Sequence, residues 1–253
     1  MTEKGGKKKS ISGLIRWILI AVCAIVFCGS AAHLLFYAKD KLDAEKAFEQ
    51  TRNRDLAELY AENSDLIGWI QIEGTKIDYP VMQTPDDPEF YLHRDFNREY
   101  SASGTPFLDS ASVVLPKDNA VTWNWLTYGH NMKFGTMFYD LQEYDSQEFR
   151  EDRKTISFDV YDPSTGLTDY GEYEIFAASR SRIREDDSQA FGYYQFAGYS
   201  DEDTFYEYVD GVKGESAYET GITPQFGEQL VTLSTCAYHT DEGRFYIVGR
   251  RIR

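Results

Sequence analysis

The sequence predicts a mainly β domain, folded as a barrel or closed sandwich, behind a single transmembrane helix. Three observations predict this: eight short strand-like segments, an abundance of aromatic residues, and one long apolar run near the N-terminus. The chain has 253 residues, with 19 Tyr and 16 Phe but only 7 Pro. Aromatic side chains favour strands and packed cores over disorder. A chain of this length has room for one membrane segment and one sizeable globular domain.

The apolar run extends from Trp17 to Ala38, and only Ser30 and His33 interrupt it with polar groups. About 20 apolar residues are enough to cross a bilayer as a helix. A cleaved signal peptide is the alternative, but the run is long for one and its end makes a poor cleavage site. We therefore expect a retained anchor at residues 17–38.

Charge changes sign along the chain. The first 38 residues carry five basic and one acidic side chain, whereas the remainder carries 21 basic and 41 acidic ones, a net charge of −20. The positive-inside rule makes residues 1–16 a cytoplasmic tail and places everything after the anchor outside the cell membrane. An acidic outer part disfavours binding to nucleic acid or to an anionic membrane face, and it favours solubility.

Beyond the anchor, the pattern predicts a helical stalk at residues 39–65 and a β domain at residues 66–253. Apolar residues between Asp40 and Glu62 fall on one helical face, and the rest of that stretch is charged. From Leu66 onward the pattern changes to short strands. The predicted strands are 66–72, 76–82, 105–109, 121–128, 155–161, 172–179, 230–235 and 244–250. This number of short strands in one domain indicates a barrel or closed sandwich.

One helix is predicted between the late strands. Ser200 and Asp203 have the spacing of a capping box. Three apolar residues follow at helical spacing: Phe205, Val209 and Val212. We expect this helix to end near Gly211 or Gly214.

Cysteine usage is the most informative feature of the composition. Cys23 and Cys28 lie in the apolar run, and Cys236 is the only cysteine outside it. Cysteines in exported domains usually pair as disulfides, which a lone cysteine cannot do within its own domain. Cys236 is therefore an inert buried thiol, an intermolecular bridge or a reactive nucleophile.

Of the four histidines, His130 is the best candidate to assist this thiol. His130 and Cys236 each stand at the end of a predicted strand, where a side chain can face a cleft. His33 lies in the apolar run, and His93 lies in an acidic, polar loop where we expect a surface role. His239 is three residues from Cys236, an awkward separation at a strand end. A thiol needs a basic or positive neighbour to react at neutral pH.

Arg244 opens the last predicted strand, eight residues after Cys236. The turn Thr240-Asp241-Glu242-Gly243 predicts a hairpin that returns the Arg244 side chain to the thiol. There it could hydrogen-bond a developing oxyanion. An ion pair between Arg244 and Asp241 or Glu242 is the alternative, and such surface pairs contribute little to stability.

These residues resemble the active-site motifs of sortases. The segment Thr232-Leu233-Ser234-Thr235-Cys236, followed by Arg244, resembles the cysteine signature of that family, and Tyr128-Gly129-His130-Asn131-Met132 resembles its histidine motif. The order of anchor, His, Cys and Arg also matches, and the likeness covers roughly Leu66 to Arg253. The helical segment before the β domain and the helix before the Cys-bearing strand make the chain most similar to class B sortases.

The resemblance implies an eight-stranded sortase β-barrel and a transpeptidase reaction. Cys236 would be the nucleophile, His130 its proton partner and Arg244 the charge stabiliser. The substrate would be the C-terminal sorting signal of a secreted protein, cleaved after Thr through a thioacyl intermediate. The acceptor would be a peptidoglycan cross-bridge amine, or a pilin lysine in a pilin-polymerising sortase. A Gram-positive cell envelope is implied in the same way.

Substrate contacts and cofactors complete the prediction. Leu92 and Ser234 are expected to contact the substrate, by resemblance to class B pockets. The aromatic stretch Phe191-Gly192-Tyr193-Tyr194 is a candidate for the cleft wall or for ordinary packing, and within it Tyr194 is a candidate substrate contact. Asp241 is a weak candidate to orient the histidine. No metal or other cofactor is expected, because the acidic runs are interpreted as solvated loop charge.

Two other classes of protein remain as alternatives. A papain-like protease would need its cysteine before its histidine, whereas His130 precedes Cys236. A non-catalytic surface binding module would have an inert, buried Cys236. The reactivity of the thiol therefore separates a binding module from an enzyme.

Overall fold

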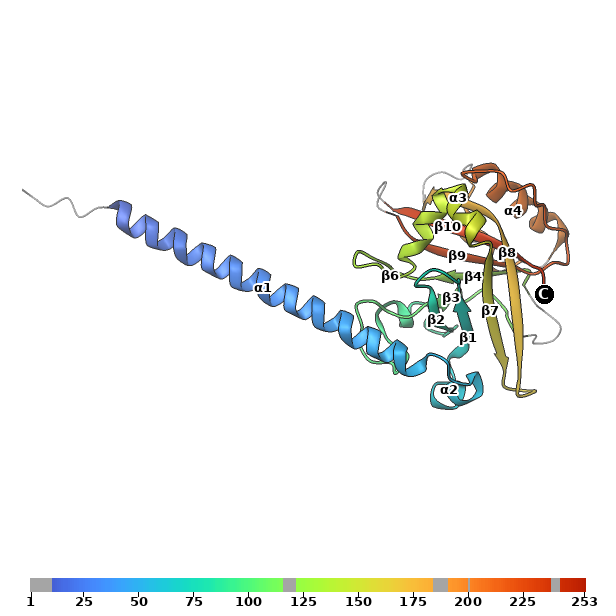
Figure 1. The fold of residues 1–253 in the computed structure, drawn as a ribbon, viewed down its shortest axis with the longest axis horizontal. Coiled ribbons are helices and arrows are strands. Elements are labelled where there is room, and N and C mark those ends of the chain that lie inside the picture. Colours follow the sequence, from blue (N-terminus) through green and yellow to red (C-terminus); the bar gives the residue numbers. More distant parts are fainter. Residues whose placement is uncertain (1–10, 116–121, 184–190, 200, 238–241) are drawn as a thin grey trace, which may run out of the picture. The chain divides into compact units, whose positions relative to one another are not determined.

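The computed structural model describes residues 11–115, 122–183, 191–199, 201–237 and 242–253 (Figure 1). Several positions named above lie outside these ranges: residues 1–10 of the predicted tail, the first residue of the predicted strand 121–128, Ser200, His239, Thr240 and Asp241. The chain divides into two compact units, one up to Asp43 and one from Ala44 onward.

The apolar run lies within helix α1 (Ile11–Thr51). The part of α1 from Ile15 onward is long and apolar enough to cross a membrane. Its large side chains are exposed, with Trp17 71%, Phe27 73% and Leu35 72% accessible. Apolar side chains facing outward all round a helix are what contact with lipid requires, so α1 could span a membrane.

The predicted stalk helix is interrupted, which corrects the expectation of one helix from Asp40 to Glu62. Helix α1 ends at Thr51, and a separate helix α2 (Leu56–Glu62) follows. Asn53 adopts a left-handed conformation with φ of 60°, which asparagine tolerates better than most residues. The Asp55 carboxylate then accepts a 2.7 Å hydrogen bond from the backbone N–H of Ala57 and caps α2.

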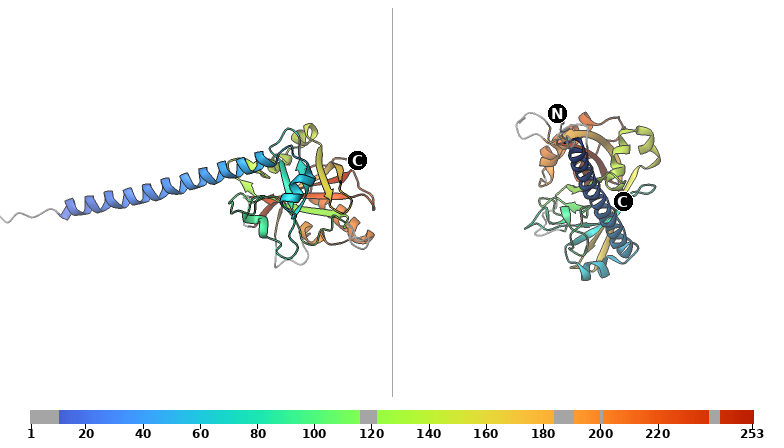
Figure 2. Two further views of the ribbon diagram at one scale, coloured as in Figure 1. Left: turned by 90° about the horizontal axis from the view of Figure 1, so that it is seen from below. Right: turned by 90° about the vertical axis from the view of Figure 1, so that its left-hand side faces the viewer.

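Eight strands close into a barrel in the order β1-β2-β3-β4-β9-β10-β8-β7 (Figures 1 and 2). They are β1 (Leu66–Gln71), β2 (Asp78–Met82), β3 (Phe107–Leu108), β4 (Asn124–Tyr128), β7 (Thr155–Asp162), β8 (Leu167–Arg182), β9 (Leu230–Cys236) and β10 (Gly243–Arg251). Each predicted strand corresponds to one of them, so the predicted closed, mainly β fold is confirmed. The largest difference is β8, which begins at Leu167 rather than Glu172 because the β7–β8 hairpin pairs as far as Asp162 and Leu167.

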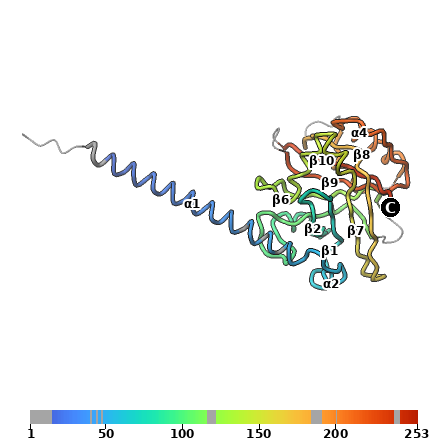
Figure 3. Tube along the Cα trace, viewed as in Figure 1, coloured from blue at the N-terminus to red at the C-terminus, as the bar shows by residue number. Residues whose placement is uncertain are grey.

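Shorter elements connect the strands, and the sequence did not predict them (Figure 3). They are the hairpin of β5 (Asn131–Met132) and β6 (Thr136–Met137), helix α3 (Gln147–Asp152), and the 3-10 helices η1 (Phe90–His93), η2 (Tyr139–Asp145) and η3 (Tyr193–Phe196). The barrel interior is apolar, and Ile70, Phe158 and Ile247 are fully buried in it.

The predicted inserted helix is α4 (Glu202–Glu215), which packs against β8 (Figure 1). Asp201 caps it by accepting a 2.9 Å hydrogen bond from Thr204 N–H, so the predicted capping box from Ser200 is not the described cap. The helix also continues past Gly211. A Cβ at Gly211 would lie 2.2 Å from the Phe191 ring, so this glycine makes room for packing instead of ending the helix.

Strands β4 and β9 pair in parallel, and this pairing positions the site. Tyr128 lies beside Ser234 in the register, and Gly129 N–H donates to the Ser234 carbonyl at 3.1 Å. Two side chains continue the connection: Thr235 Oγ1 donates to the Gly129 carbonyl at 2.7 Å, and Asn131 Nδ2 donates to the Cys236 carbonyl at 2.8 Å. The residues on both sides of position 130 are therefore hydrogen-bonded to the end of β9.

We expect a chain that begins at Asp40 to fold without the anchor, because every barrel strand lies beyond that point. Phe48 is 4% exposed and packs edge-on against Tyr79, with ring centroids 4.9 Å apart. A matched chain that begins at Asn53 loses this ring and should be less stable by about 3–5 kcal/mol. Thermal unfolding measures both, and a missing cooperative transition in the Asp40 chain would contradict the assigned boundary.

We also expect Thr235→Val to destabilise the protein by about 1–3 kcal/mol, because it leaves the Gly129 carbonyl without its hydrogen bond while keeping the side-chain shape. Thr235→Ser keeps the hydroxyl and is the matched control. Chemical denaturation compares the two variants with the unmodified chain. Equal stability of all three would show that this hydrogen bond between the two strand ends contributes nothing to the free energy of unfolding.

Candidate active site

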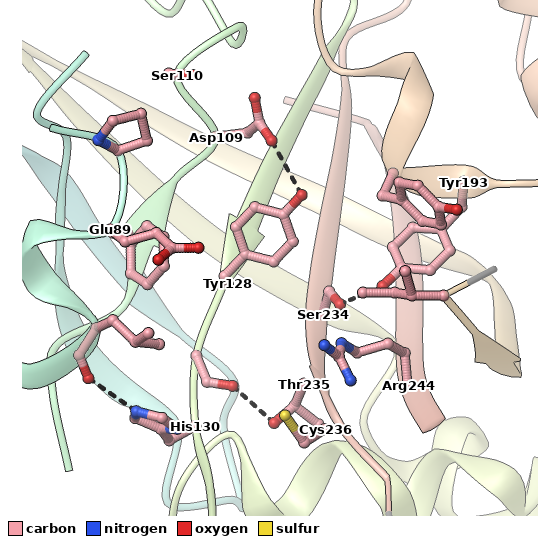
Figure 4. Close-up of a pocket in the computed structure, with 16 residues that line it drawn as sticks. Glu89, Asp109, Ser110, Tyr128, His130, Tyr193, Ser234, Thr235, Cys236 and Arg244 are labelled. Carbon is pink, nitrogen blue, oxygen red and sulfur yellow. Dashed lines mark hydrogen bonds between the residues drawn. The ribbon is translucent and has the colours of Figure 1, made fainter. Parts of the chain in front are cut away.

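A pocket of about 370 Å³ opens at the end of strands β4, β9 and β10 (Figure 4). Its wall combines apolar side chains with polar and ionisable ones. The polar and ionisable residues of the wall are Glu89, Asp109, Ser110, Tyr128, His130, Tyr193, Tyr194, Ser234, Thr235, Cys236 and Arg244. Concave sites that combine an apolar wall with a few converging polar groups are typical of ligand binding.

Cys236 is the last residue of β9, and its side chain is partly exposed in this pocket. Arg244 lies directly opposite on β10, as the predicted hairpin requires. Residues opposite each other in an antiparallel pair have side chains on the same face of the sheet. Figure 4 shows the guanidinium of Arg244 beside Cys236 and Ser234.

Arg244 makes two contacts on the pocket wall. Nη1 donates to the Gly243 carbonyl at 3.0 Å, and Nη2 lies 3.6 Å from the Glu242 carboxylate. The Glu242 side chain is 69% exposed, so this ion pair is screened by solvent. Part of the guanidinium is therefore available to a ligand next to the thiol.

His130 follows β4 and reaches the same pocket, because the parallel pairing of β4 with β9 carries both chains to one end of the barrel. Its Nε2 lies 2.8 Å from the Leu92 carbonyl. A carbonyl only accepts, so neutral His130 carries its proton on Nε2 and its lone pair on Nδ1. Figure 4 shows Nε2 on the side of the ring away from Cys236.

Burial is the main cause that lowers the pKa of His130 below its usual value. The hydrogen bond to Leu92 acts in the opposite direction, and charge on His93 lowers the pKa further. His130 is therefore neutral at neutral pH and can accept a proton at Nδ1.

His93 is the main residue of the site that sequence reasoning missed. We expected a surface role for it, and its side chain is exposed. Its ring also stacks on that of His130, with centroids 5.5 Å apart and planes inclined by 25°. The two histidines belong to segments far apart in the chain, so no local pattern indicated the contact.

Two further tyrosines lie on the wall: Tyr193, from the aromatic stretch predicted as a candidate wall, and Tyr128, for which no role in the site was predicted. Tyr193 is hydrogen-bonded to the Ser234 hydroxyl at 2.6 Å, and burial raises the pKa of Tyr193 to about 12. Tyr128 donates to Asp109 Oδ2 at 3.0 Å, and burial is the main cause that raises its pKa. Both phenols stay protonated at neutral pH and remain hydrogen-bond donors.

The structure brings the predicted site residues into one pocket wall: Leu92, His130, Tyr194, Ser234, Cys236 and Arg244. The backbone carbonyl of Leu92 also accepts the hydrogen bond from His130 Nε2. The type of side chain at position 92 could not predict this backbone contact. Asp241, the suggested orienter, and His239 lie outside the described residues. In the part of the chain that the structure describes, no three His, Cys, Asp or Glu side chains gather as metal ligands.

Comparison with known proteins identifies the family. No protein-family model matches the chain. The chain is 32% identical to sortase B of Listeria monocytogenes serovar 1/2a over 200 residues, which are 78% of this chain and 74% of that protein. The structure of Clostridium perfringens sortase B matches with a TM-score of 0.65 and 29% identity, covering 79% of this chain and 100% of that one. A Staphylococcus aureus sortase B–substrate complex matches with a TM-score of 0.65 and 27% identity, covering 85% and 92%.

The barrel topology and the sequence identity to the Listeria protein agree with the motifs around the pocket. The resemblance seen in the sequence is therefore confirmed. This chain belongs to the sortase family of transpeptidases, and within it to the class B sortases.

Proposed function

We propose that this protein is a cysteine transpeptidase that cleaves a C-terminal sorting signal of secreted proteins after Thr and transfers the acyl group to an amine of the cell wall. The observation that carries the proposal is the meeting of Cys236, His130 and Arg244 in one pocket. A nucleophile, a neutral base and a fixed cation at one place are the parts that acyl transfer needs.

In the first step, Cys236 Sγ attacks the carbonyl carbon of the substrate Thr, and the thiol proton moves to Nδ1 of His130. The carbonyl oxygen becomes an oxyanion, which the Arg244 guanidinium stabilises. Since the Leu92 carbonyl holds Nε2–H, Nδ1 is the ring atom that exchanges protons. The ring does not have to turn between accepting a proton and donating it.

In the second step the scissile C–N bond breaks, and His130 gives its proton to the leaving amine. The acyl group stays on sulfur as a thioester. An acceptor amine then attacks the thioester carbonyl, His130 takes the amine proton, and the new C–N bond forms as the C–S bond breaks. The proton returns to the Cys236 thiolate, so the enzyme ends in its starting state.

Substrate binding is assigned to the rest of the pocket wall. Leu92 offers an apolar surface, and Ser234 and Tyr194 flank the end of β9. The staphylococcal relative has been solved as a complex with a substrate, which supports peptide binding in the equivalent fold. Helix α1 would anchor the chain with its basic N-terminus in the cytoplasm and the barrel outside, the topology that reaches secreted substrates.

A pilin-polymerising sortase is the second candidate. It would use the same first half-reaction and accept a pilin lysine in place of a peptidoglycan cross-bridge amine. Incubation with a labelled sorting peptide and each amine in turn, followed by mass spectrometry of the products, identifies the acceptor.

We expect Cys236→Ala to abolish peptide cleavage and transpeptidation while the fold persists, because Cys236 is the thiol of the pocket. Mass spectrometry with a library of sorting peptides should show a thioacyl adduct on the unmodified chain and none on the variant. Cys23→Ala and Cys28→Ala, both in α1, are matched controls and should retain the adduct. Substantial turnover by pure Cys236→Ala protein would exclude the mechanism.

We expect Arg244→Lys to lower kcat/KM by roughly 10²–10³-fold, because lysine keeps the charge but loses the planar pair of donors. The melting temperature should barely move, since the exposed pair with Glu242 contributes only about 0–1 kcal/mol. Arg250→Lys is the control on the same strand, where the side chain pairs with Glu174 and Glu228. Near-normal turnover by Arg244→Lys would show that a diffuse positive charge is sufficient.

A further inference from the structure

Two consecutive residues of η1 hold His130 from outside the barrel. The Leu92 carbonyl accepts from Nε2 at 2.8 Å, and the His93 ring stacks on the imidazole at 5.5 Å. The backbone of this segment is itself fixed. Thr105 N–H donates to the Tyr91 carbonyl at 3.0 Å, and Ser101 N–H donates to the His93 carbonyl at 3.1 Å. The backbone that carries the His93 ring is therefore held at a defined place.

The two stacked rings differ in their access to water. His93 is exposed, whereas burial of His130 is the main cause that lowers its pKa. Histidine is the side chain that changes charge closest to neutral pH, and charge on the His93 ring lowers the pKa of His130. A charge on one ring then opposes a charge on the other.

Other ionisable groups share the pocket with His130. From the wall they are Glu89, Asp109, Tyr128, Tyr193, Tyr194, Cys236 and Arg244. Asp109 already accepts from the Tyr128 hydroxyl, and Arg244 pairs with Glu242. Of the charged groups in the described part of the chain, His93 is the one that shifts the pKa of His130.

We propose that His93 is a positioning residue for His130: its stacked ring keeps His130 free of a second proton as the pH falls. The ring supplies both a flat surface stacked on the plane of His130 and a positive charge when it is protonated. The effect on catalysis rests on the proposed function, in which only neutral His130 can take the thiol proton from Cys236.

The expected size follows from Coulomb's law. Two unit charges about 5.5 Å apart, screened as in water, shift a titration by about half a pH unit. Removing the charge of His93 should raise the pKa of His130 by this amount. The acid limb of the kcat/KM profile should then move to higher pH.

The test compares two substitutions in the full chain, solubilised in detergent. His93→Phe keeps a flat ring without charge, and His93→Lys keeps a cation without a flat ring. The titration of the His130 ring is followed by NMR in a Cys236→Ala background, and the pH profile of kcat/KM is followed with Cys236 present. His33→Phe, in α1, is the control for loss of a histidine elsewhere.

We expect His93→Phe to raise the pKa of His130 by about half a pH unit, and we expect His93→Lys and His33→Phe not to raise it. An unchanged His130 titration in His93→Phe would overturn the proposal. So would an equal loss of activity at every pH in both His93 variants, because that result indicates a purely structural contact. The NMR titration needs no turnover, so a shifted titration in a chain without transpeptidase activity would retain this inference and reject the proposed function.

Discussion

The site depends on the parallel pairing of β4 with β9. The strands of this barrel are otherwise mostly antiparallel neighbours, and a parallel pair directs both chains to the same end of the sheet. Tyr128 pairs with Ser234 in this register. If the register is continued by two residues on each chain, His130 lies opposite Cys236. The antiparallel β9–β10 pair then adds Arg244 on the other side of Cys236. Three functional groups from distant parts of the sequence meet because three adjacent strands end together.

Backbone groups do much of the positioning at this end. The Leu92 carbonyl selects the tautomer of His130, and the Gly129 and Cys236 carbonyls accept from side chains of the opposite segment. A carboxylate in the place of the Leu92 carbonyl would stabilise the protonated imidazole more strongly. The neutral carbonyl orients the ring without adding a negative charge, so burial remains the dominant cause of the lowered pKa of His130.

The sequence was sufficient for the barrel and for the six predicted residues of the pocket wall, but not for the contacts that position them. Short strand-like segments, some with alternating apolar residues, predicted every barrel strand, and the hairpin between Cys236 and Arg244 followed from its turn. The break after Thr51 was missed because an amphipathic pattern continues across it, while the local conformation of Asn53 and the cap by Asp55 decide the outcome. The stacking of His93 on His130 is a long-range contact made by an irregular segment, and periodicity carries no information about such contacts.

Burial has two effects at this site that act together. It lowers the pKa of His130, so that the ring is neutral and, in the proposed mechanism, able to accept the proton of the Cys236 thiol. Arg244 is partly buried as well, and in the proposed mechanism its interaction with an oxyanion would strengthen as water is excluded. Exclusion of water would also favour attack on the proposed thioester by a bound amine over hydrolysis. A drier pocket would protect the intermediate better but would make a charged His130 costlier when it carries the proton. The ring of His93 bears on both requirements. It covers one face of His130, and it is itself exposed to solvent.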